Sequence, residues 1–327
     1  MLSRFFTQLR LRRLPLLCMA VVILGLPAGC AILQYKEREL LFNIEPGAAS
    51  SYRGLPRDVQ EFELKPASFK LGHYIHGWWW PAAKKDAPAI LYLHGARWNL
   101  TGQLFRIEQL HAQGFSVLAI DYRGFGQSQG DLPSEASVYE DARIAWEHFQ
   151  TLQPDPVRRL IYGHSLGGAV AIDLAAELSK QAADNQVPSP VQGLVIEATF
   201  TSLADAARAM ANTSLPVCWV LSQKFASIDK IADIHMPLLV VHGLDDGFVP
   251  PRFSQQLYAA AQEPKHLLLV PGVRHNSTMH LGGHRYRQAL DELLLTKMPA
   301  HGDTTKMRPE LIANEPHSPL NSGPTSE

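Results

Sequence analysis

Short apolar runs alternate with longer amphipathic segments along most of the chain. The apolar runs are rich in leucine, isoleucine, valine and aromatic residues, and we expect each to form a buried strand: residues 73–82, 88–95, 115–120, 159–163, 193–198, 237–243 and 265–272. Between them, apolar residues recur at helical spacing: residues 100–113, 138–151, 203–210 and 252–261, a segment beginning at 165 and another after 276. This alternation predicts an α/β fold, with a mostly parallel central sheet flanked by helices on both faces. Functional residues in such a fold gather at the carboxyl ends of the strands.

The first 35 residues have a different pattern. Residues 14–35 carry no charged side chain, and Arg4, Arg10, Arg12 and Arg13 precede them. An apolar stretch of this length can span a bilayer. Because arginines beside such a stretch stay on the cytoplasmic side, the rest of the chain is expected to be membrane-anchored on the extracytoplasmic side.

A cysteine near the end of this stretch offers another route to the membrane. Residues 26–30, Leu-Pro-Ala-Gly-Cys, resemble a bacterial lipobox, in which a small residue precedes a cysteine that is lipidated and becomes the mature N-terminus. Pro27 departs from that pattern, which usually has an aliphatic residue three before the cysteine. Three alternatives stay open: lipidation of Cys30, an uncleaved signal anchor within residues 1–35, and ordinary secretion. Residues 36–54 are then expected to be a linker.

Composition and charge limit the kinds of function. The 327-residue chain is 46% apolar, which suits a folded core, and its net charge of −1 provides no basic field to attract nucleic acid. Cys18 and Cys30 lie in the N-terminal stretch, which leaves Cys218 alone, so no disulfide is expected within the folded part. The polar, proline-bearing residues 298–327 are expected to be a disordered tail. With both ends of the chain set aside, we expect residues 55–297 to form a single domain.

A serine between glycines stands where a strand is expected to pass into a helix. The sequence there is Gly163-His164-Ser165-Leu166-Gly167. Flanking glycines allow the tight, strained turn that exposes a serine hydroxyl, and the following helix directs its partly positive N-terminus at an oxyanion. The pentapeptide alone also fits a purely structural turn, so its meaning depends on partners elsewhere in the chain.

A serine nucleophile needs a base, and the base needs a carboxylate to hold its tautomer. Two later strand ends supply both groups. Asp245 and Asp246 follow the strand at 237–243, and His275 follows the strand at 265–272. Spacing alone does not choose between the two aspartates.

An oxyanion formed during acyl transfer needs two backbone N–H donors. One is expected from Leu166, directly after the serine, and the other from the loop after an earlier strand. His94-Gly95-Ala96 ends the strand at 88–95, so we assign the second donor to Ala96. The other histidines have no spacing typical of metal ligands, and no metal is expected.

Together these motifs resemble the ordered set of the α/β-hydrolase family: His94-Gly95, residues 121–130 (DYRGFGQSQG), 163–168 (GHSLGG), 242–250 (HGLDDGFVP) and 272–275 (GVRH). The resemblance covers residues 55–297, and the nearest branch is that of membrane-associated hydrolases related to serine aminopeptidases and protein-depalmitoylating thioesterases. It implies the α/β-hydrolase fold with a short cap at about 199–236. It also implies that Asp246 is the acid, because this residue matches the family pattern His-Gly-x-x-Asp-x-x-Val-Pro.

The sequence and the resemblance together predict a membrane-tethered serine hydrolase. Ser165 would attack a carbonyl, His275 would relay the proton, and Asp246 would orient His275. Water would then release the acid, and no cofactor is expected. The short cap suggests a fairly open site for an ester, a thioester or a monoacyl lipid. Two alternatives stay open: a serine aminopeptidase-like peptidase, and a catalytically silent binding module.

The residue after the His-Gly pair departs from the family pattern. Relatives in this branch often carry asparagine there, whereas this chain has Ala96, followed by Arg97 and Trp98. A backbone N–H survives that change, so the oxyanion role of Ala96 is retained. Arg97 could meet an anionic substrate group or be a solvated loop charge.

Overall fold

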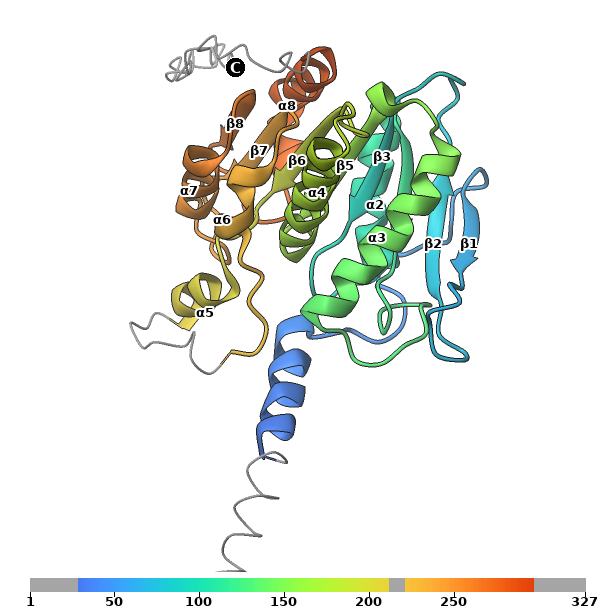
Figure 1. The fold of residues 1–327 in the computed structure, drawn as a ribbon, viewed down its shortest axis with the longest axis vertical. Coiled ribbons are helices and arrows are strands. Elements are labelled where there is room, and N and C mark those ends of the chain that lie inside the picture. Colours follow the sequence, from blue (N-terminus) through green and yellow to red (C-terminus); the bar gives the residue numbers. More distant parts are fainter. Residues whose placement is uncertain (1–28, 212–220, 297–327) are drawn as a thin grey trace, which may run out of the picture.

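The computed structural model describes residues 29–211 and 221–296. The predicted C-terminal tail, Cys218 and residues 1–28 of the predicted membrane-anchor segment lie outside these residues. Within them, the chain forms one central sheet with helices on both sides (Figure 1). The predicted α/β architecture is therefore confirmed.

Eight strands form the sheet, in the order β1-β2-β4-β3-β5-β6-β7-β8. Their bounds are β1 Gln60–Leu64, β2 Ile75–Trp80, β3 Ala89–Leu93, β4 Ser116–Ile120, β5 Arg159–His164, β6 Gly193–Glu197, β7 Leu238–Gly243 and β8 Lys265–Val270. From β4 onward in this order all neighbours pair in parallel, whereas β2 pairs antiparallel with both β1 and β4. This is the mostly parallel sheet that the sequence pattern predicts.

The apolar pattern does not predict β1. Its sequence, Gln-Glu-Phe-Glu-Leu, is mostly polar, and both glutamates are exposed. The strand forms because its whole length pairs with β2, while Phe62 packs against the ring of His148 at a centroid distance of 4.8 Å. Charged side chains on such an edge strand also oppose pairing with a second chain.

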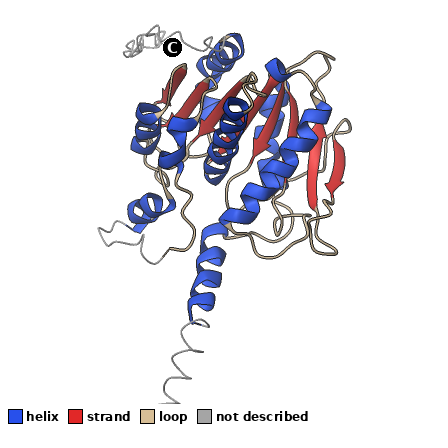
Figure 2. Ribbon diagram, viewed as in Figure 1, coloured by secondary structure: helices blue, strands red, loops and turns tan. Residues whose placement is uncertain are grey.

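Helices cover both faces of the sheet (Figures 1 and 2). On one face lie α3 (Glu135–Leu152), α4 (Leu166–Asp184), α6 (Ser227–Lys230) and α7 (Arg252–Ala260), and on the other lie α2 (Leu100–Ala112) and α8 (Thr278–Leu295). The helix α5 (Leu203–Ala211) lies beyond the end of β6, at the lower end of the molecule in Figure 1. Two short 3-10 helices, Pro156–Arg158 and Ile231–Asp233, precede β5 and follow α6.

Side chains of the central strands alternate between two apolar cores. In β3, Leu91 and Leu93 join the core beneath α3, α4 and α7, whereas Ile90 and Tyr92 join the core beneath α2 and α8. All four side chains are fully buried. Because helices cover both faces, the middle positions of the central strands are apolar, and polar residues such as Arg159 and Glu197 stand at the strand ends.

Two helices differ from the sequence pattern for local reasons. The helix α3 begins at Glu135, earlier than the predicted start at residue 138, because Ser134 and Ser137 form a capping box there. The helix α8 bends at Gly283, whose φ of +47° favours glycine.

The N-terminal segment is packed onto the domain. Residues 29–42 are helical, and this helix projects from the same end of the molecule as α5 (Figure 1). Phe42 is fully buried, with its ring edge-on to those of Phe125 and Phe225. The segment for which we predict a linker, residues 36–54, therefore contributes to the core as well as joining the domain to what precedes it.

The helix formed by residues 29–42 is also fastened to residues 222 and 223, within the segment that we predict to be a cap. The carboxylate of Glu37 accepts from the backbone N–H groups of Ser222 and Gln223 at 2.8 and 2.9 Å. Cys30, at the exposed end of this helix, is a free cysteine. Within residues 29–211 and 221–296, no helix combines the length and the apolar character that crossing a membrane requires.

Candidate active site

Ser165 lies at the sharp turn between β5 and α4. Its φ of +55° and ψ of −120° lie outside the regions that serine ordinarily adopts, and its N–H donates to the carbonyl of Glu197 at 2.8 Å. A Cβ at Gly163 would lie 2.2 Å from the carbonyl oxygen of Gly167, and a Cβ at Gly167 would lie 2.0 Å from that of Leu93. Both positions therefore require glycine, because strand, turn and helix approach one another too closely for a side chain.

Three side chains from three strand ends form one hydrogen-bonded chain. Ser165 Oγ lies 3.0 Å from His275 Nε2, and His275 Nδ1 lies 2.6 Å from Asp246 Oδ2. Asp246 follows β7 and His275 follows β8, so the parallel sheet brings both loops to the edge at which β5 ends. A hydroxyl that contacts an imidazole, itself in contact with a carboxylate, can lose its proton to that imidazole.

The structure separates the two adjacent aspartates. Asp246 is buried and reaches His275, whereas Asp245 is exposed and its backbone N–H donates to the carbonyl of Val273 at 3.0 Å. Residues 244 and 245 form a turn closed by the N–H of Asp246 on the carbonyl of Gly243, and this turn leaves Asp245 exposed while Asp246 is buried. The aspartate in contact with the imidazole is thus the one that the resemblance implies.

One predicted oxyanion donor directly follows Ser165, and the loop that carries the other lies against this serine. Leu166 is the first residue of α4, so its N–H has no carbonyl partner within the helix. The turn that leads to Ala96 lies against the serine, since a Cβ at Gly95 would be 3.1 Å from Ser165 Cβ. The loop and the helix start that carry the two predicted donors therefore both adjoin Ser165.

The loop that follows β3 is held by the N-terminal segment. The N–H of Arg97 donates to the carbonyl of Phe42 at 2.8 Å, and the N–H of Glu45 donates to the carbonyl of Arg97 at 2.9 Å. The Arg97 guanidinium pairs with the Glu45 carboxylate at 3.0 Å. Further along the loop, Asn99 Nδ2 donates to the carbonyl of Gly47 at 2.7 Å. Arg97 therefore serves to hold this segment, and its charge is already paired.

Known proteins are similar to this chain in sequence and in fold. A family model described as serine aminopeptidase, S33, matches residues 84–229. The crystal structure of an alpha-beta hydrolase from Vibrio vulnificus has a TM-score of 0.63 and 21% identity, covering 80% of this chain and 93% of that one. An uncharacterized protein of Mycobacterium tuberculosis is 34% identical over 290 residues, which are 87% of this chain and 96% of the relative. The chain belongs to the α/β-hydrolase family.

A lipase is also among the relatives of this α/β-hydrolase. Lysophosphatidylserine lipase ABHD12 of Danio rerio is 32% identical over 219 residues. The match covers 58% of this chain and 54% of that lipase, so it spans about half of the relative. The resemblance inferred from the sequence motifs is confirmed at the level of the family.

One residue of the α/β-hydrolase site lies in the motif at 242–250 without a role having been predicted for it. His242 lies near the end of β7 and is fully buried beside the acid. Its Nε2 lies 3.1 Å from Asp246 Oδ2 and 2.8 Å from the carbonyl oxygen of Val249, and its Nδ1 lies 2.6 Å from Ser254 Oγ. Because a carbonyl can only accept, the proton sits on Nε2 and Ser254 donates to Nδ1. The pattern His-Gly-x-x-Asp contains both side chains and was the available signal for this contact.

The surroundings of Asp246 keep it ionised. Its Oδ1 accepts from the backbone N–H groups of Phe248 and Val249 at 2.8 and 2.9 Å. Burial by itself would raise the pKa of Asp246, but hydrogen bonds from His242 and His275, together with the charge of His275, outweigh burial. The pKa of this carboxyl is therefore held well below its usual range, and the α/β-hydrolase has a carboxylate ready to stabilise an imidazolium.

Two other buried histidines support the loops around the site. His164 Nε2 donates to the carbonyl of His275 at 3.2 Å, and His94 Nδ1 donates to the carbonyl of Gly95 at 2.6 Å. Burial lowers the pKa of both imidazoles, and the positive charges of Arg106 and His275 lower that of His164 further. In the part of the chain that the structure describes, no three His, Cys, Asp or Glu side chains are grouped so as to hold a metal ion.

A fully buried ion pair lies beneath the α/β-hydrolase site. Arg106 of α2 contacts Glu197 at the end of β6, with 2.7 Å between nitrogen and oxygen. The hydroxyls of Tyr286 and Thr278 also donate to Glu197. Because Thr278 begins α8, this network fixes the start of the helix that follows the His275 loop. Removing one partner would leave the other charge buried and unpaired.

Proposed function

We propose that the protein is a serine hydrolase that cleaves a carboxylic ester or a thioester through an acyl-enzyme on Ser165. The observation that supports this role is the continuous chain of contacts from Ser165 Oγ through His275 to Asp246, at 3.0 and 2.6 Å. Membership of a hydrolase family supports the reaction class.

In the first half of the reaction, Ser165 Oγ attacks the substrate carbonyl carbon while His275 Nε2 takes the hydroxyl proton. Negative charge moves onto the carbonyl oxygen, where the N–H groups of Ala96 and Leu166 stabilise it. The imidazolium of His275 then gives its proton to the leaving alcohol or thiol, and the bond between the acyl carbon and that group breaks. Asp246 holds the proton of Nδ1 in place and stabilises the imidazolium.

In the second half, water takes the place of the leaving group. His275 removes a proton from the water, whose oxygen attacks the acyl carbon on Ser165. The acid leaves, and Ser165 recovers its proton from His275. Every proton that the base accepts is returned, so the cycle requires no cofactor.

We propose a single-chain lipid ester as the substrate class. A relative that is 32% identical over its matched part is, by its name, a lysophosphatidylserine lipase. The arrangement of the chain adds support, because the helix formed by residues 29–42 projects from the same end as the cap helix α5 (Figure 1). A tether through the N-terminus would therefore bring that end toward a bilayer.

The tether itself is part of the proposal. Residues 14–35 are uncharged and preceded by arginines, and Cys30 lies in a lipobox-like sequence. Either an uncleaved anchor or lipidation of Cys30 would hold the domain on the extracytoplasmic side of a membrane.

A peptidase is the second candidate, because the matching family model is described as serine aminopeptidase. Amide bonds could be cleaved by the same acyl-enzyme chemistry. Comparing p-nitrophenyl esters, acyl thioesters and aminoacyl anilides with purified protein separates the two candidates. Faster turnover of the anilides would favour the peptidase.

The role of Ser165 is tested by fluorophosphonate labelling of wild type and Ser165→Ala. We expect labelling of wild type only, and a loss of esterase activity of at least about 10⁴-fold in the variant, since no other group can form the acyl-enzyme. Circular dichroism of both proteins controls for folding. If folded wild type is not labelled, the protein is a silent binding module and the proposed function is wrong.

A further inference from the structure

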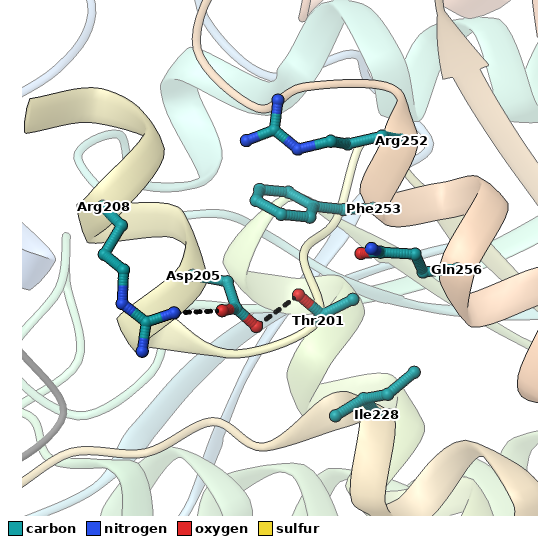
Figure 3. A pocket seen from close by; sticks show the side chains of 7 residues that line it. All are labelled: Thr201, Asp205, Arg208, Ile228, Arg252, Phe253 and Gln256. Carbon is teal, nitrogen blue, oxygen red and sulfur yellow. Dashed lines mark hydrogen bonds and ion pairs between the residues drawn. The ribbon is translucent and has the colours of Figure 1, made fainter. Parts of the chain in front are cut away.

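A pocket of about 490 Å³ opens between α5 and α7, with Ile228 of α6 on its wall (Figure 3). Its volume lies within the roughly 300–1,000 Å³ of small-molecule sites. One wall contains Thr201, in the segment that follows β6, and the other begins with Arg252, which follows the loop that carries Asp246. The pocket thus lies between the segments that continue β6 and β7, at the edge of the sheet where Ser165 stands.

The charges that line this pocket are unbalanced. The carboxylate of Asp205 is fully engaged: its Oδ1 accepts from Arg208 at 2.8 Å, and its Oδ2 accepts from the hydroxyls of Thr201 and Ser202 at 2.7 Å each. The positive charge of Arg208 is therefore compensated. Arg252 faces the pocket from the opposite wall and has no carboxylate partner among the described residues. The pocket carries one uncompensated positive charge.

The side chains around Arg252 favour an anionic group joined to an organic one. Arg252 and Gln256 project from the same face of α7 toward α5, one helical turn apart (Figure 3). The guanidinium lies over the ring of Phe253 at 5.0 Å, and Ile228 adds an apolar wall. Guanidinium and amide N–H groups match phosphate oxygens, and the apolar wall suits carbon-bearing parts of a ligand.

We propose that this pocket binds a phosphate-bearing head group of the substrate, with Arg252 as the recognition residue. The proposal rests on the proposed function, because it assigns a head group to the lipid ester that Ser165 cleaves. It makes the protein selective for lysophospholipids over neutral monoacylglycerols.

Two esters that differ only in the phosphate test this selectivity: 1-lauroylglycerol 3-phosphate and 1-lauroylglycerol. In wild type, we expect kcat/KM to be higher for the phosphate ester. In Arg252→Gln, the ratio of the two kcat/KM values should fall by about tenfold or more, mainly through KM, as expected for loss of a charged hydrogen bond. The matched control is Arg57→Gln, which removes an exposed arginine near β1 and should keep the wild-type ratio. An unchanged ratio in Arg252→Gln overturns the proposal.

A binding measurement separates failure of the pocket from failure of the hydrolase. We expect sn-glycerol 3-phosphate to bind wild type in calorimetric titration, about tenfold more weakly to Arg252→Gln, and normally to Arg57→Gln. If wild type does not bind it, the pocket assignment is wrong even if esters are cleaved. If inorganic phosphate binds as tightly as sn-glycerol 3-phosphate, the head-group assignment is wrong. If binding depends on Arg252 but neither ester is cleaved, the proposed function fails and the anion site stands.

Discussion

Asp245 and Asp246 leave the same strand and differ in every contact. Only Asp246 reaches His275, at 2.6 Å, whereas the side chain of Asp245 is exposed. We predict that Asp246→Asn lowers kcat by a factor of about 10⁴, because an amide cannot hold the required tautomer or stabilise the imidazolium. Asp245→Asn should change kcat far less. Both variants are measured with one activated ester, and circular dichroism checks their folding.

The relative losses of kcat in the two aspartate variants decide which carboxylate is the acid. A larger loss in Asp245→Asn than in Asp246→Asn would assign the acid to Asp245 and contradict the geometry described here. Equal, small losses in both would mean that His275 needs no carboxylate for its role.

The low pKa of Asp246 makes a prediction about the acid limb of the pH profile. A carboxyl whose pKa lies well below its usual range stays ionised as the pH falls, so Asp246 adds no proton uptake of its own to the acid limb. We predict that the slope of log kcat/KM against pH for an activated ester does not exceed one proton down to about pH 4, where ordinary carboxyls begin to titrate. A slope of two would show that Asp246 takes up a proton in this range.

At the scale of elements, the approach of α4 to β3 sets the position of the serine turn. A Cβ at Gly167, two residues after Ser165, would meet the carbonyl oxygen of Leu93 at 2.0 Å. We predict that Gly167→Ala lowers the free energy of unfolding by about 3 kcal/mol. The matched control is Gly247→Ala, where an added Cβ meets nothing within 4 Å and the change should stay within about 0.5 kcal/mol. Urea unfolding of both variants provides the values, and equal costs would contradict the close approach.

The elements also show what can be predicted from sequence. The central strands are found because both of their faces are buried, which makes them continuous apolar runs. The edge strand β1 is missed because its formation depends on pairing with β2, and its polar sequence carries no apolar run. The start of α3 is set by Ser134 and Ser137, a local signal that the apolar spacing does not contain.

At the site, the order of motifs along the sequence predicts which residues lie at strand ends, but it does not predict which of them touch. The order of motifs identifies Ser165 and His275 as candidates. The contact between Asp246 and His275 depends instead on the direction of the Asp246 side chain in the folded loop. The role of His242 depends on burial against the acid, and the hold of residues 42–49 on the loop after β3 depends on packing between distant parts of the chain. None of these contacts produces a repeating pattern of apolar and polar residues from which it could be predicted.

For the whole molecule, Cys30→Ser separates the two proposed tethers. A lipoprotein would fail to be lipidated and processed in this variant, because the acyl chains attach to the thiol. An uncleaved anchor would be unaffected. We predict that wild type is recovered with membranes, and that gel mobility and metabolic lipid labelling of the variant identify the tether. Wild type recovered wholly soluble outside the cytoplasm would contradict both versions.

The helix formed by residues 29–42 links tether and site mechanically. Phe42 fixes one end in the core and Glu37 fastens the helix to Ser222 and Gln223, so the helix and the domain move together. With its N-terminus at a bilayer, the enzyme would search for substrate in two dimensions. Its rate would follow the mole fraction of substrate among the lipids, and diluting a substrate with inert lipid at constant bulk concentration would slow turnover.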